Sequence, residues 1–92
     1  MSKETTAYCY ANGVIRFGKT TPKGAIAIAT GPRKKLRDLI HARCRWSYPT
    51  TRGDSKTEVP LVPGIPEAPD QMAALAALVQ FARWIKQTLE AA

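Results

Sequence analysis

The sequence predicts an α+β fold in which a small, mainly antiparallel sheet packs with two helices on one of its faces. Asn12-Gly13 stands between two stretches of β-forming residues, which is a strong signal for a β-hairpin. Two later segments, 32–44 and 71–90, carry apolar residues at helical spacing. A chain of 92 residues has the length of one domain. We therefore expect residues 1–92 to form a single domain with a flexible start at 1–6.

The first third of the chain predicts three strands. Residues 7–11 and 14–18 are rich in aromatic and β-branched residues. We expect them to pair through a type I′ turn, which needs positive φ at both central residues. Residues 25–29 alternate alanine and isoleucine, which predicts a short apolar strand. Pro32 follows, and proline suits the first position of a helix.

The first helix is expected over residues 32–44. Its apolar residues recur at intervals of three and four and so lie along one stripe. They are Leu36, Leu39, Ile40 and Cys44. The remaining face of this helix is basic.

The segment between the two helices is expected to be largely extended. Trp46 and Tyr48 suit another extended piece, and the composition of residues 49–57 predicts an exposed loop. Prolines interrupt the apolar residues of 58–64, and proline cannot donate to a strand ladder, so this is at best an edge strand. Prolines recur at every third position from 60 to 69, which fits a polyproline II-like stretch.

The second helix is expected over residues 71–90, because Asp70 is a good N-cap residue. Its apolar stripe consists of Met72, Leu75, Leu78, Val79, Ala82, Ile85 and Leu89, broadened by Phe81 and Trp84. So broad an apolar face predicts wide burial or a contact surface. It would also permit a dimer.

Positive charge is concentrated in residues 33–45, which supply +5 of the net charge of +7. The cations are Arg33, Lys34, Lys35, Arg37, Arg43 and Arg45. Cations at the start of a helix oppose the macrodipole, but they strengthen an anion-binding spot made by free backbone N–H groups. We expect these residues to anchor an acidic partner, either a nucleic acid or an acidic protein surface. The alternative is a solvated basic face.

A nucleic acid would use the same residues in a recognisable way. The cations would contact phosphates, with Arg52 nearby, and would give salt-dependent affinity with little sequence information. Trp46 and Tyr48 could stack on unpaired bases.

The proline-spaced loop 60–69 is a second candidate surface. A rigid apolar loop loses little entropy when it docks. Leu61 and Ile65, with Trp84 from the second helix, are therefore candidate apolar contacts. The loop could instead cover the core between the edge strand and the last helix, and the sequence leaves both interpretations open.

The sequence contains fragments of catalytic and cofactor-binding motifs, but the residues around them do not suit those functions. Residues 13–20 match the phosphate-loop pattern G-x-x-x-x-G-K-T, but such a loop must open a helix, and here Pro22 prevents one. Cys9, His41 and Cys44 are too few for a structural zinc site, which takes four ligands. The chain has one histidine and scattered carboxylates, so no acid–base or nucleophilic arrangement is evident. We expect no catalytic residue, no metal and no cofactor, and hence a protein that is not an enzyme.

The location of the protein is expected to be cytoplasmic. No apolar stretch approaches the length of about 18 residues that a membrane span needs. The first six residues lack the apolar run of a signal peptide. Both cysteines are then expected to be reduced thiols.

Three stretches carry a resemblance to a known group of proteins. They are residues 7–18 (AYCYANGVIRFG), 22–26 (PKGAI) and 61–68 (LVPGIPEA). In these stretches the chain resembles small phage and prophage proteins described as host nuclease inhibitors. The resemblance implies a non-catalytic protein in the host cytoplasm that binds a host exonuclease, with a RecBCD-type helicase–nuclease as the obvious target.

Several functions stay open beside this one. A nuclease can be blocked by an acidic imitation of DNA, but a basic chain cannot act in that way. It would have to cover an acidic surface, wedge a moving domain or bind the DNA end. The alternatives are a basic nucleic-acid-binding accessory protein and an inhibitor of another defence nuclease, such as a CRISPR effector.

Overall fold

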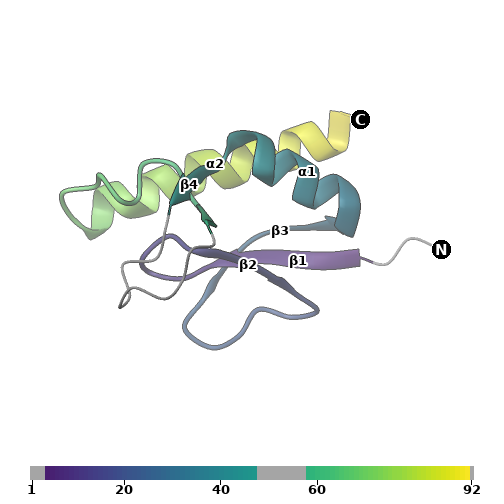
Figure 1. The fold of residues 1–92 in the computed structure, drawn as a ribbon, viewed down its shortest axis with the longest axis horizontal. Helices are drawn as coiled ribbons and strands as arrows, with labels where there is room; N and C mark the ends of the chain where they lie inside the picture. The colour runs from purple at the N-terminus through teal and green to yellow at the C-terminus, as the bar shows by residue number, and fades with distance from the viewer. Residues whose placement is uncertain (1–3, 48–57, 92) are drawn as a thin grey trace.

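The computed structural model describes residues 4–47 and 58–91, and these form an α+β fold of two antiparallel sheets and two helices (Figure 1). The elements are β1 (Glu4–Cys9), β2 (Ile15–Gly18), β3 (Ile26–Pro32), α1 (Arg33–Arg43), β4 (Arg45–Ser47), β5 (Val59–Leu61) and α2 (Gln71–Ala91). The predicted fold class is therefore confirmed. Tyr48 and the expected loop 49–57 lie outside the described residues.

The larger sheet has the strand order β2-β1-β3, so the first strand lies in the middle. Its pairing begins at Glu4, opposite Pro32. Residues 4–6, which belong to the start expected to be flexible, thus pair with the far end of β3. A contact of 3.0 Å between the hydroxyls of Thr6 and Thr30 adds to that pairing. No local signal in the sequence announces this long-range partner.

The hairpin between β1 and β2 has a different turn from the one predicted. The carbonyl of Tyr10 accepts a hydrogen bond from the amide of Gly13 at 2.8 Å, so the turn is centred on Ala11 and Asn12. Gly13 follows with a φ of 91°. A turn followed by a glycine with positive φ is the usual three-residue hairpin connection. Asn12 supports it, because its side-chain oxygen accepts a hydrogen bond from the amide of Val14 at 3.1 Å.

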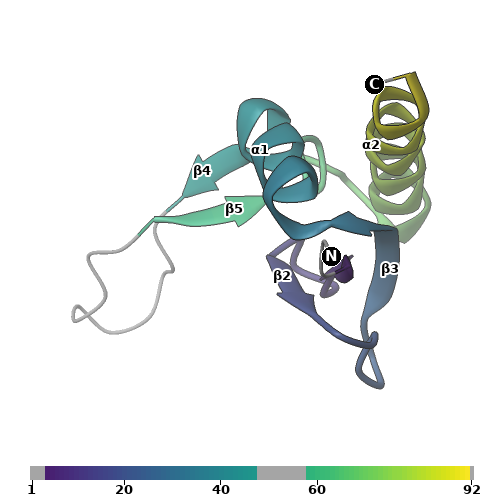
Figure 2. The same cartoon turned by 90° about the vertical axis from the view of Figure 1, so that its right-hand side faces the viewer.

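Both helices cover the same face of the larger sheet. In Figure 2, α1 lies above the β1–β2 side and α2 lies above β3. Pro32 precedes α1 and closes β3, with no side-chain cap on the helix. Asp70 caps α2 as predicted, because its carboxylate accepts a hydrogen bond from the amide of Ala73 at 2.8 Å.

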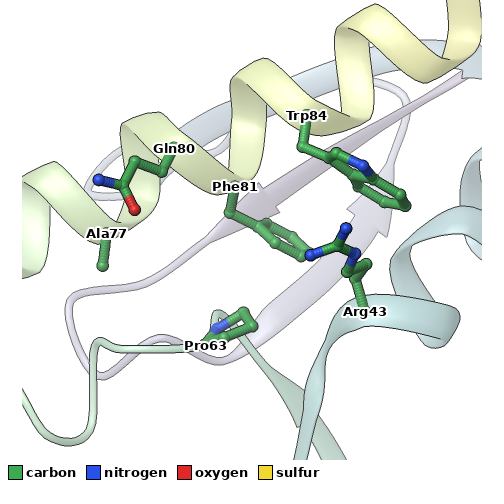
Figure 3. A pocket seen from close by; sticks show the side chains of 6 residues that line it. All are labelled: Arg43, Pro63, Ala77, Gln80, Phe81 and Trp84. Carbon is green, nitrogen blue, oxygen red and sulfur yellow. The ribbon is translucent and has the colours of Figure 1, made fainter.

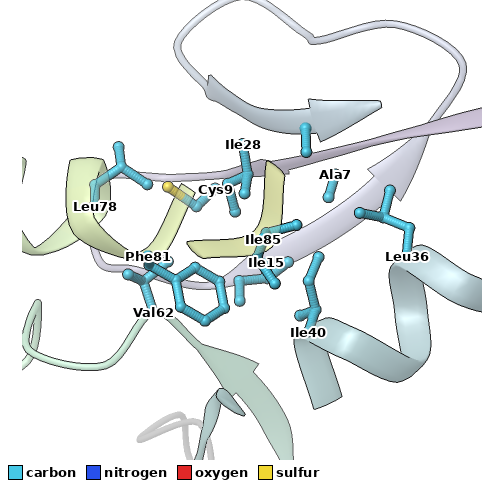
Figure 4. Packing of buried hydrophobic residues seen from close by; sticks show 11 residues of the cluster. Ala7, Cys9, Ile15, Ile28, Leu36, Ile40, Val62, Leu78, Phe81 and Ile85 are labelled. Carbon is cyan, nitrogen blue, oxygen red and sulfur yellow. The ribbon is translucent and has the colours of Figure 1, made fainter. Parts of the chain in front are cut away.

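The core lies between these helices and the sheet (Figure 4). Its largest fully buried side chains are Ile15, Ile28, Leu36, Ile40, Ile85, Val62 and Cys9. Leu36 and Ile40 come from the stripe predicted on the first helix, and Ile85 comes from the stripe on the second. Burial of this apolar surface is the main force that holds the layers together.

The short hairpin of β4 and β5 continues the structure beyond β2. Val14 forms an isolated bridge with Leu61, and the amide of Val62 donates to the carbonyl of Gly13 at 2.9 Å. These contacts attach the hairpin turn to the segment after β5. The predicted edge strand over 58–64 is thus present in a shorter form, as β5.

The proline-spaced segment covers the core rather than forming an extended contact surface. Residues 63–67 form turns, with a hydrogen bond from the amide of Ile65 to the carbonyl of Val62 at 3.3 Å. A polyproline II helix has no internal hydrogen bonds, so that prediction was wrong here. Leu61 is 9% exposed and Val62 is fully buried. Leu61, a predicted apolar contact, therefore offers a partner little surface.

Candidate functional site

The fold divides the predicted basic cluster among different surroundings. Arg33 and Arg37 line a groove between α1 and β2. Arg43 lines a separate hollow against α2, and Arg45 pairs with Glu67. Two further members, Lys34 and Lys35, are exposed on α1 outside the described hollows. Only part of the cluster therefore forms one site.

The groove that holds Arg33 and Arg37 is the candidate functional site, and we call it the basic groove. It has a volume of about 420 Å³. Its lining residues are Ile15, Arg16, Phe17, Arg33, Arg37, His41, Trp46 and Pro60. They come from β2, α1, β4 and β5, so the groove exists only in the folded chain.

Helix geometry explains why the cations of α1 line this groove. Arg33, Arg37 and His41 are spaced by four residues and therefore lie on one flank of the helix. Leu36 and Ile40 are fully buried, and they fix which way α1 is rotated on the sheet. The flank of α1 that carries Arg33, Arg37 and His41 then faces β2. Arg16 of β2 lines the same groove.

Aromatic rings form a series along the groove. The His41 ring lies 6.3 Å from the Phe17 ring, with planes at 84°. The His41 ring also lies 4.9 Å from the Trp46 ring. Trp46 remains 42% exposed. An exposed indole beside arginines is a surface on which a base, a guanidinium or another flat group can stack.

The arginines of the groove have no acidic partner within the described residues. Among the described residues, an ion pair joins Arg45 of β4 to Glu67 in the turns after β5, at 2.6 Å. The first turn of α1 contains no acidic residue, so its backbone N–H groups add to the positive potential. Arg16, Arg33 and Arg37 thus make a local excess of positive charge that favours an anionic group.

His41 carries its own electrostatic signature in this groove. Burial lowers the pKa of His41 below its ordinary value of 6.5, the charge of Arg37 lowers it further, and Asp38 opposes the shift. The imidazole is therefore neutral at pH 7. A bound anion would act in the opposite direction, because a nearby negative charge favours the protonated ring.

Arg43 is engaged with the second helix rather than with the groove. Its guanidinium carbon lies 4.4 Å from the centre of the Trp84 ring, within the range of a cation–π contact. Figure 3 shows the two side chains side by side in a hollow that Pro63 and Phe81 also line. Trp84, a predicted apolar contact, is thus partly covered by Arg43 and packs against the core.

Ile65 and Arg45 also make contacts within the chain. Ile65 is partly buried against the core, close to Gly13 of the hairpin turn. The side chains of Arg45 and Glu67 remain 55% and 52% exposed, so this ion pair contributes little to stability, about 0–1 kcal/mol. A partner could still reach Arg45, but it would have to compete with Glu67.

The described residues contain no group of three or more His, Cys, Asp or Glu side chains that could hold a metal ion. Burial raises the pKa of the Cys9 thiol to about 11 and also raises that of Cys44. Both cysteines are therefore protonated at neutral pH and poorly nucleophilic. The residues of the phosphate-loop pattern form the hairpin turn and β2, and the next helix of the chain is α1.

Arg16 and Phe17 belong to the groove but were not among the predicted site residues. Period-two alternation in the strand could have indicated that Arg16 lies on the side opposite Ile15. Arg16 lines the groove together with Arg33 and Arg37 only because α1 packs beside the edge strand β2, which is a tertiary contact. The sequence indicated Trp46 as a ring on which bases could stack and His41 as a weak candidate metal ligand, but the contact between the two rings has no local signal.

Comparison of the chain with protein-family models, curated proteins and solved structures found no match. Within residues 4–47 and 58–91, neither helix is long and apolar enough to cross a membrane.

Proposed function

We propose that this protein is a non-catalytic inhibitor of a host DNA-processing nuclease of the RecBCD type, and that the basic groove is the surface through which it acts. The resemblance of three sequence stretches to phage host nuclease inhibitors supplies the class of target. The basic groove is the surface proposed to bind that target.

One observation carries the proposal. Arg16, Arg33 and Arg37 converge on one groove, and no acidic side chain of the described chain neutralises them. Unpaired cations around a concave surface raise the rate and strength of binding to an anionic partner. A nuclease offers two such partners, its own acidic surface and the DNA that it holds.

The test is a DNA-degradation assay with a purified RecBCD-type nuclease, run beside a gel shift of the protein on the same DNA. Inhibition without a shift of free DNA supports docking on the enzyme. If the wild-type protein neither inhibits the nuclease nor shifts DNA, the proposal is refuted.

Matched charge reversals locate the surface. The double variant Arg33→Glu/Arg37→Glu changes the groove, whereas Lys34→Glu/Lys35→Glu makes the same change in net charge outside it. We expect the groove variant to lose inhibition at least tenfold, about 1.4 kcal/mol of binding energy, and the control to lose much less. Equal losses would mean that net charge alone matters, and the groove would lose its assigned role.

A second function is direct binding of single-stranded nucleic acid, and the exposed ring of Trp46 favours it. Stacking of a base on an aromatic side chain contributes about 1–3 kcal/mol. Three arginines that each neutralise one phosphate would give a salt slope of about −2 for a single strand. A gel shift that weakens with this slope, and that is lost in Trp46→Ala, would support this function over docking on the nuclease.

A further inference from the structure

The open edge of the larger sheet is unlike a protected edge strand. The opposite edge of the sheet, formed by β2, has a neighbour: Val14, just before β2 in the chain, forms a bridge with Leu61 of β5. β3 pairs only with β1 among the described residues. Its sequence, IAIATGP, contains no charged residue. Proteins usually protect such edges with charges, proline or a covering segment. β3 has proline only at its last residue, Pro32, so the rest of its uncharged edge is open to a partner strand.

The second helix turns this edge into a groove. Leu78 and Ile26 line one hollow at the start of β3, and a Cβ atom on Gly31 at its end would lie 3.4 Å from Leu89. From Leu78 to Leu89 a helix rises roughly 16 Å, and from Ile26 to Gly31 a strand covers roughly the same distance. α2 therefore runs alongside the whole of β3.

The hollow between β3 and α2, which we call the edge groove, has a volume of about 500 Å³. Its apolar residues are unusually exposed: Ile26 at 50%, Leu75 at 46% and Val79 at 48%. A smaller hollow of about 120 Å³ shares Ile26 and Leu75 and extends the apolar surface past the start of the strand. Contiguous exposed apolar surface of this kind marks an interaction site.

The far part of the edge groove is charged. Arg83 and Lys86 line it, with Glu90 as the single acid in the lining. The excess positive charge favours a carboxylate on whatever occupies the groove. An occupant thus needs a backbone that pairs with β3, apolar side chains near Val79 and an acidic group near Arg83.

We infer that the edge groove binds an extended segment of another protein, which adds to β3 as a fourth strand and carries alternating apolar residues next to an acidic residue. The backbone of the segment would pair with the free edge of β3, as in other cases of strand addition. Its alternate side chains would pack against Leu75 and Val79 of α2, because side chains in a strand alternate between faces.

A second copy of this chain is a poorer occupant. In a two-fold pairing of β3 with itself over its full length, the middle of the strand lies on the axis. Arg83 is placed alongside that middle, because α2 and β3 run together from Leu78 and Ile26 to Leu89 and Gly31. The two copies of Arg83 would then face each other, and like charges in such positions are unfavourable.

The experiment is a display selection of a random peptide library on the intact protein, with peptides longer than the 7 residues of β3 so that a whole added strand fits within each. Binding of the enriched peptides is then measured on two matched variants. Val79→Lys places a charge in the apolar part of the edge groove. Ala76→Lys makes the same change at an exposed position of α2 outside the described hollows. Amide hydrogen exchange identifies the backbone that the peptides protect.

We expect enriched peptides that alternate apolar residues, carry an acid at one end of the apolar stretch, and protect amides of β3. Their affinity should fall at least about tenfold in Val79→Lys and stay unchanged in Ala76→Lys, while Arg83→Glu should select basic peptides instead. The inference is overturned if no peptide is enriched, or if the peptides bind both lysine variants equally. It is also overturned if light scattering finds a wild-type dimer that Val79→Lys dissociates, since a second copy would then be the occupant.

Discussion

Gly13 is the residue at which the hairpin turn and the core-covering segment meet, so its replacement should be costly. Its φ of 91° lies in the region that favours glycine. A Cβ atom at this position would lie 3.2 Å from both Cβ and Cγ2 of Ile65, closer than the optimum of about 3.5–4.0 Å between carbon atoms. Ile65 has little room to move, because its amide is bonded to the carbonyl of Val62.

The magnitude for Gly13→Ala follows from these two effects. A non-glycine residue in the left-handed region costs about 1–2 kcal/mol, and forcing an extra methyl group into a packed site costs about 1–3 kcal/mol. Alanine also reduces the conformational entropy of the unfolded chain, which stabilises the folded protein by about 0.4–1 kcal/mol. These ranges combine to a net loss of about 1–5 kcal/mol with a centre near 3, a large share of the stability of a domain of this size.

Gly24→Ala is the matched control, because Gly24 has nearly the same φ of 88° but no atom within 4 Å of the added Cβ. Gly24→Ala should lower the free energy of unfolding only through the cost of its left-handed backbone. That loss is about 1 kcal/mol once the reduced entropy of the unfolded chain is subtracted. Urea denaturation at constant m-value measures both losses. If Gly13→Ala loses no more than Gly24→Ala, the contact with Ile65 has no energetic weight and the reasoning is wrong.

Three further predictions concern α1 and α2. Asp70→Ala should lower the free energy of unfolding by about 1 kcal/mol through loss of the N-cap, and Asp70→Asn, measured in the same urea titration, should restore most of it. Arg43→Ala should cost about 0.5–2 kcal/mol through loss of the ring contact, whereas Lys35→Ala should stay within about 0.5 kcal/mol; equal effects would contradict the contact. His41 has a lowered pKa in the folded state, so the unfolded chain binds more protons as pH falls through 6.5, and stability should decline in that range. Thermal denaturation of His41→Gln should show a smaller decline, and an unchanged pH profile would refute the assignment.

The helices and the hairpin could be predicted because their signals are local. The stripe through Leu36 and Ile40 and the cap at Asp70 are each written within a few neighbouring residues. The strand order β2-β1-β3 could not be predicted, since it depends on pairing between residues more than twenty positions apart, such as Thr6 and Thr30. Pairing with β1 also extends β3 through Gly31 to Pro32. The low strand propensity of glycine and proline predicts that the strand would end before them.

The candidate site could be predicted only in part, for a related reason. Charge density along the chain groups six cations, but side chains on a helix turn by about 100° per residue. Arg33 and Arg37 therefore share a flank, whereas Arg43 is turned toward Trp84. The sequence could have indicated this division, because Arg37 follows Arg33 by four residues and Arg43 follows Arg37 by six. The contribution of Arg16 would not have been found, because it requires the position of β2 under α1.

The basic groove and the edge groove lie along opposite strands of the larger sheet and share no lining residue. One is bordered by β2 and α1, the other by β3 and α2. Substitutions at distant sites with no common contacts usually act independently. A protein with two such surfaces can hold an anionic partner with one and an extended segment with the other. If both partners belong to one complex, the second contact forms at a high effective concentration and strengthens the first. Under the proposal made above, two modest surfaces would in this way give a small domain tight binding to a large nuclease complex.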